Sequence, residues 1–166
     1  MAGHDKITPE GKKFFKEIEA LRKLQVRVGF QQGEASTESG ADIVDVAMWN
    51  ELGTANSPAR PFLRQSVDNN EARIIAMCKA QLQAIARGDT DAKGALQAIG
   101  AMQKGLIQDT IRNGSFAPNA PITVNGGWMW RNGKAFYVKG KGSNKPLIDT
   151  GRMRQSVNFV IQEKGG

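Results

Sequence analysis

The tripeptide Asp149-Thr150-Gly151, preceded by Leu147-Ile148, has the residue types of an aspartic-protease half-site. Such a protease needs two carboxylates that share one proton across a cleft, and a β-rich body that holds both. Fewer than twenty residues follow Gly151, and they begin with the helical-looking segment "RMRQS". We therefore expect a structural role, in which Asp149 or Thr150 caps a short helix over Gly151 to Ser156.

Other catalytic and metal-binding patterns are weak in this chain. The only histidine is His4, so His-based triads and His-rich metal sites are absent from the sequence. The segment "GGWMWRNGKA" lacks the glycine spacing of a P-loop, and Ala135 stands where that loop has Ser or Thr. The pair Asp42 and Asp45 is better explained by a helix cap and a solvent-facing acid. The sequence therefore predicts a protein that is not an enzyme, with no catalytic, metal or cofactor residues.

Composition sets broad limits on class and location. The chain has 166 residues, 40% of them hydrophobic, and a formal net charge of +7. A basic surface favours anionic surroundings such as nucleic acid or an acidic protein. The single cysteine, Cys78, excludes an internal disulfide and fits a reducing compartment. We find no secretory signal and no apolar run long enough to span a membrane, so a soluble cytosolic product is expected.

Hydrophobic spacing predicts the elements that would position functional residues. Thr8 and Pro9 begin a helix, and "QVRVGF" predicts a strand over 25–31. Asp42 begins a second helix that ends at Gly53 and is apolar nearly all round, which is typical of a helix that is buried or covered by a partner. Longer helices are predicted over 63–87 and 91–112, separated by Gly88.

The Gly-, Asn- and Pro-rich loop over 115–145 carries an inserted β-hairpin at about 126–139. Asn132-Gly133 suits its two-residue turn, and the arms carry Trp128, Trp130, Phe136 and Tyr137. An isolated hairpin is marginally stable, so these rings are expected to pack on this domain, on a neighbouring copy or on a partner. A closing strand, "SVNFVIQ", is able to pair with strand 25–31. The prediction is a small single α+β domain over 1–166, with helices packed on an antiparallel sheet, a flexible N-terminus over 1–7 and a flexible loop over 32–41.

Basic residues gather around this hairpin. They are Arg131, Lys134, Lys139, Lys141 and Lys145. Basic residues interleaved with aromatic rings grip single-stranded nucleic acid in some proteins, so nucleic-acid binding through loop 126–145 is one function to consider. The alternative is a solvated loop that docks onto an acidic protein surface. No helix-turn-helix, zinc-finger or RNA-recognition signature accompanies the cluster.

Three stretches together resemble a known family. "VAMWNELGTANSPARPFLRQSVDNN" (46–70) is similar to the signature "A-x-x-N-E-[FL]-G-T … P-x-R-P-F-L-R" of small tail-completion or neck proteins of tailed bacteriophages. "KPLIDTGRMRQSV" (145–157) resembles the second signature of that family, and "IGAMQKGLIQDTIRNGSFAPNAP" (99–121) resembles the helix and loop between them. The order and spacing agree over roughly 26–161. The hairpin insertion departs from the shorter family members.

The resemblance implies a structural virion protein at the head–tail junction. It implies a homo-oligomeric ring, usually of six copies, that contacts head-completion or connector proteins and a tail terminator or tail tube. Genomic DNA would pass through the lumen without sequence-specific binding, and the protein would be made in the host cytoplasm and reside in the virion. A ring requires a head-to-tail interface. Candidate interface residues are Trp49, Glu51, Arg60, Phe62, Arg64, Trp128, Trp130, Arg131 and Tyr137, with Phe62 either at the interface or in the core of its own chain.

Overall fold

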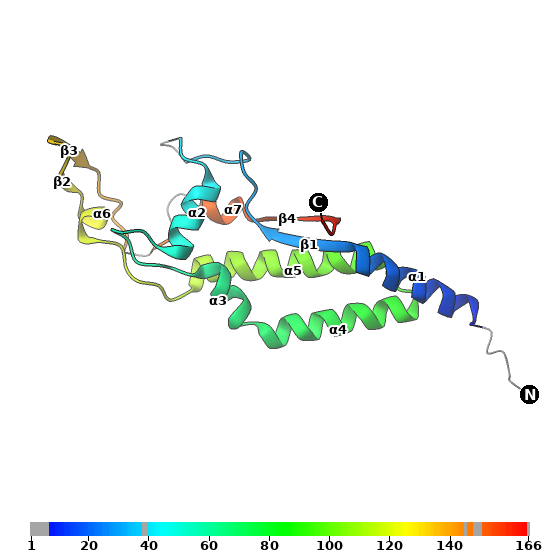
Figure 1. The fold of residues 1–166 in the computed structure, drawn as a ribbon. Helices are drawn as coiled ribbons and strands as arrows, with labels where there is room; N and C mark the ends of the chain where they lie inside the picture. The colour runs from blue at the N-terminus through cyan, green and yellow to red at the C-terminus, as the bar shows by residue number, and fades with distance from the viewer. Residues whose placement is uncertain (1–6, 38–39, 145, 148–150, 166) are drawn as a thin grey trace, which may run out of the picture. The chain divides into compact units, whose positions relative to one another are not determined.

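The computed structural model describes residues 7–37, 40–144, 146–147 and 151–165. Within this part of the chain, helices are combined with short strands (Figure 1). The elements in chain order are α1 (Pro9–Lys23), β1 (Leu24–Gly29), α2 (Ile43–Leu52), α3 (Phe62–Asp68), α4 (Glu71–Arg87), α5 (Ala92–Asn113), α6 (Pro121–Asn125), β2 (Gly127–Arg131), β3 (Lys134–Val138), α7 (Arg152–Gln155) and β4 (Asn158–Glu163). Helices α2 to α6 follow one another without an intervening strand. The prediction of a small α+β fold is confirmed.

The first of two compact units comprises Met1–Gly29, Ser66–Leu106 and Asn158–Gly166. Its sheet pairs β1 with β4 in antiparallel register, with Val26 opposite Ile161 and Val28 opposite Phe159. This is the pairing that the period-two pattern made possible. Helix α5 packs closely on the sheet, because a Cβ atom added at Gly100 would lie 2.6 Å from the Phe159 ring.

Side chains define the helix ends of this unit. The Thr8 hydroxyl accepts a hydrogen bond from the Gly11 amide at 3.1 Å, which confirms the predicted start of α1. The Glu17 carboxylate accepts one from the Ala92 amide at 2.9 Å, so a residue of α1 caps the start of α5.

The prediction of one helix over 63–87 is wrong. The helix ends at Asp68 and a second one begins at Glu71. The Asn70 side chain donates to the Ser66 carbonyl at 3.1 Å, and its backbone amide donates to Val67. Asparagine competes in this way with the helical hydrogen-bond pattern, which explains the break.

The second unit comprises Phe30–Gln65 and Ile107–Val157. Helix α2 begins as predicted at Asp42, whose carboxylate accepts hydrogen bonds from the amides of Val44 at 2.9 Å and Gly33 at 2.8 Å. These bonds, first from Val44 and then from Gly33, lower the pKa of Asp42. Gly53 ends the helix with φ 78°, a conformation that favours glycine.

The second unit also contains the predicted hairpin and the short helices α6 and α7. The hairpin forms as expected, with Asn132 and Gly133 at positive φ in its turn. Helix α6 was not predicted, because "PITVN" falls within the loop assigned to 115–145. Gly151 is the N-cap residue of α7, whereas Asp149 and Thr150 lie outside the described residues, so their capping role stays a prediction.

Candidate partner-binding surfaces

Arg60, a predicted interface residue, lies inside the second unit and joins three of its segments. Only 9% of Arg60 is exposed. Its guanidinium donates to the carbonyls of Ala117 at 2.9 Å and Pro118 at 3.1 Å, and more weakly to the side-chain oxygens of Asn50 and Asn119 at 3.4 Å. Burial lowers the pKa of Arg60, but an arginine stays charged at neutral pH. The side chain therefore serves as an internal brace, and its predicted role at an interface stays a prediction.

Glu51 and Phe62 also have internal roles. The Glu51 carboxylate accepts hydrogen bonds from the amides of Leu63 at 2.8 Å and Arg64 at 3.2 Å, so it caps the first turn of α3. Phe62 is fully buried and meets the Phe30 ring edge-on at 6.0 Å, which selects the core alternative for this residue. Of the residues predicted around Pro61, Arg64 presents its side chain to solvent.

The hairpin exposes most of its aromatic surface. Strand alternation and the pairing of Trp128 with Tyr137 place Trp128, Trp130 and Tyr137 on one face. The exposed fractions of these residues are 69%, 75% and 58%, although Trp128 and Tyr137 contact each other edge-on at 5.6 Å. We call these three residues the aromatic face. Arg131 is also exposed, at the turn end of β2.

Backbone hydrogen bonds hold the base of the hairpin. The amides of Lys141 and Gly142 donate to the carbonyls of Thr123 and Val124 in α6, at 2.9 and 3.0 Å. Gly126 and Gly140 approach so closely that a Cβ atom at either one would meet backbone at 2.5–2.6 Å. The root of the hairpin is therefore structured, even though its rings are exposed.

Helix α2 carries a second exposed apolar surface. Asp45, Met48, Trp49 and Leu52 are spaced i, i+3, i+4 and i+7, so they form one stripe along the helix. Met48 and Trp49 are each 48% exposed, and Leu52 is 65% exposed, whereas Ile43 and Ala47 fill the buried side. We call the four residues the α2 stripe. Of these four residues, only Trp49 was assigned to an interface from the sequence. The helical spacing from Asp45 was a signal for the other three.

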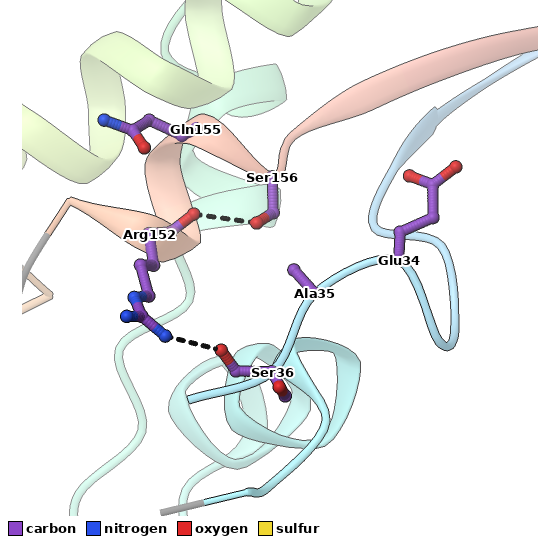
Figure 2. Close-up of a pocket in the computed structure, with 6 residues that line it drawn as sticks. All are labelled: Glu34, Ala35, Ser36, Arg152, Gln155 and Ser156. Atoms are coloured by element: carbon purple, nitrogen blue, oxygen red, sulfur yellow. Dashed lines mark hydrogen bonds between the residues drawn. The ribbon is translucent and has the colours of Figure 1, made fainter. Parts of the chain in front are cut away.

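A shallow cavity of about 400 Å³ lies between α7 and the loop after β1. Figure 2 shows the Arg152 side chain extending toward this loop, where it donates to the Ser36 carbonyl at 3.0 Å. The Ser156 hydroxyl donates to the Arg152 carbonyl at 2.8 Å. The lining is completed by Glu34, Ala35 and Gln155. This arrangement joins two segments, and the lining residues that the structure describes form no hydrogen-bonded nucleophile–base pair.

The described residues contain no group of three metal-ligating side chains, and none of the helices described is long and apolar enough to cross a membrane. The charged residues predicted around the hairpin are exposed where they are described, and Lys145 lies outside that part. Comparison of the chain with models of protein families, with curated proteins and with solved structures found no match. The aromatic face and the α2 stripe therefore remain as the candidate functional surfaces.

Proposed function

We propose that this chain is a structural virion protein of a tailed bacteriophage, which forms an oligomeric ring at the head–tail junction. The observation that carries the proposal is the aromatic face, whose two tryptophans and one tyrosine are largely exposed. Large exposed apolar patches mark interaction sites, and aromatic residues are enriched at protein interfaces. Such a surface suits a protein whose task is to join other proteins.

The phage assignment is supported by the resemblance of the blocks at 46–70, 99–121 and 145–157 to tail-completion and neck proteins. Within the first block, Arg60 donates hydrogen bonds to Asn50, and Glu51 caps α3. These residues of the motif therefore have a structural role. Expected partners are further copies of the chain in a ring of about six, a connector or head-completion protein, and a tail terminator or tail tube.

Native mass measured on the purified chain tests this proposal, alone and with the neighbouring neck proteins. A discrete ring of about six copies, in either condition, is the expected result. A chain that stays monomeric and ignores those proteins at every concentration would contradict the junction role.

Nucleic-acid binding is the second candidate, because Arg131, Lys134, Lys139 and Lys141 are exposed beside the aromatic face. That function predicts affinity for single-stranded DNA that falls steeply with salt and persists in the monomer. If the affinity for single-stranded DNA is weak and does not change between about 50 and about 200 mM salt, this function is contradicted.

A further inference from the structure

We propose that the aromatic face of one copy docks on the α2 stripe of a second copy of this chain. The contact is head-to-tail, since two different surfaces meet and each copy keeps one of each for the next neighbour. This inference rests on the self-association included in the proposed function, and it names the two surfaces that would form the junction.

The sequence segments that carry the two surfaces have opposite charge. Residues 28–59, which contain α2, include no lysine or arginine, and their acidic residues are Glu34, Glu38, Asp42, Asp45 and Glu51. Residues 110–148, which contain the hairpin, include no aspartate or glutamate, and their basic residues are Arg112, Arg131, Lys134, Lys139, Lys141 and Lys145. In a chain of mixed charge, this separation makes the two surfaces attract each other in different copies and repel their own kind.

The surfaces also match in size and layout. The α2 stripe runs roughly 10 Å from Asp45 to Leu52 at the helical rise. Strand β2 runs roughly 10 Å from Trp128 to Arg131 at the strand rise. Each has apolar side chains along its length and a charged residue at one end: Asp45 on the stripe, and on the hairpin the exposed Lys139, two residues after Tyr137. A rim of charge around an apolar centre is the usual anatomy of a protein interface.

The tip of the hairpin also calls for an acidic neighbour. Arg131 and Lys134 lie directly opposite each other in the register of β2 and β3, and both are exposed. Like charges at opposed positions destabilise a strand pair, and an acidic neighbour would relieve that cost on the side of the hairpin opposite the aromatic face. A nucleic acid would satisfy this basic pair too, but it would leave the acidic, apolar α2 stripe uncovered. A second copy accounts for both surfaces.

Three serine substitutions in the full chain test the pairing. Trp130→Ser alters the hairpin and Leu52→Ser alters the stripe; both residues are largely exposed, so the fold should be retained. Leu82→Ser on α4 is the control, because Leu82 is also exposed but lies outside both surfaces. Sedimentation velocity over a concentration series should show self-association weakened roughly 30-fold or more by each of the first two, and by less than about 3-fold by the control. Circular dichroism checks that all three are folded.

Mixing the two weakened variants gives the sharpest result. The Leu52→Ser chain keeps an intact hairpin and the Trp130→Ser chain keeps an intact stripe, so one good junction should form between them. The expected product is a one-to-one dimer that does not grow into a ring. If Leu52→Ser still assembles as wild type while Trp130→Ser does not, the hairpins pair with each other and the inference is overturned.

A charge exchange gives an independent readout. Asp45→Lys and Lys139→Glu should each weaken association, and the double variant should recover most of it, with all effects reduced in high salt. If both serine variants form wild-type rings, the inference fails while the proposed ring stands. If the wild-type chain never self-associates, with or without neck proteins, both fail, and salt-dependent binding of a single-stranded DNA oligonucleotide would then identify nucleic acid as the occupant.

Discussion

The Arg60 brace leads to a quantitative stability prediction. Replacement of Arg60 by methionine keeps an apolar stem of similar length but removes every guanidinium donor. The carbonyls of Ala117 and Pro118 would lose hydrogen bonds of 2.9 and 3.1 Å. Each bond has a charged donor and should contribute about 1.5 kcal/mol, whereas the two contacts at 3.4 Å are near the weak limit and add little. The expected loss in the free energy of unfolding is therefore about 3 kcal/mol.

Thermal and urea unfolding of the full chain measure this loss. For a chain of this size, about 3 kcal/mol corresponds to a fall of about 6–12 °C in the melting temperature. Arg64→Met is the matched control, because Arg64 belongs to the same sequence block but presents its side chain to solvent. Its effect should stay within about 0.5 kcal/mol. Arg60→Lys should fall between the two, since an ammonium group lacks the planar fork that serves two carbonyls. Equal melting temperatures for Arg60→Met and Arg64→Met would refute the brace.

Three further outcomes are expected. Glu51→Ala should lower the free energy of unfolding by about 1–2 kcal/mol in urea titrations because α3 loses its capping carboxylate, and an unchanged midpoint would remove that role. Gly100→Ala should destabilise the fold by about 1–3 kcal/mol, because the new methyl group meets the Phe159 ring. Gly105→Ala, where an added Cβ has nothing within 4 Å, should be neutral or stabilising. The same sign for both would contradict the packing of α5 on the sheet. The lowered pKa of Asp42 means that its ionised form contributes stability above its unfolded pKa, near 3.9, and that this is lost as pH falls through the folded pKa. The difference in melting temperature between wild type and Asp42→Asn should thus shrink from about pH 5 to about pH 2, and a constant difference would argue against this linkage.

Local signals were sufficient for several elements of the fold. Thr8, Asp42 and Gly53 mark helix ends through chemistry that depends only on the neighbouring residues, and Asn132-Gly133 marks a hairpin turn in the same way. The break between α3 and α4 was missed because the apolar spacing continues across Asn69 and Asn70. Its cause is a competing side-chain hydrogen bond, which periodicity does not reveal.

Long-range partners limited the prediction of the site. The composition around Pro61 suggested exposed anchors, since arginine and aromatic residues are enriched at interfaces. The same residue types also suit a buried brace and a core ring, and only the fold decides between these roles. The acceptors of Arg60 are carbonyls 57 and 58 residues further along the chain. No local pattern around Arg60 predicts them. The rings of the hairpin were expected to pack on this domain, on a neighbouring copy or on a partner, and their exposure shows that the described part of this chain does not bury them.

The internal role of the first sequence block changes where an interface should be sought. Arg60 holds the segment around Ala117 and Pro118, and Asn119 in turn donates to the Ser143 carbonyl at 3.2 Å, just beyond the hairpin. The block at 46–70 thus supports the root of the hairpin through Arg60. Substitution of Glu51, Arg60 or Phe62 would therefore affect assembly indirectly, through stability, whereas the exposed residues Trp130 and Leu52 test binding with little effect on the fold. A loss of assembly without a fall in melting temperature is consequently the property that separates a true contact residue from a brace.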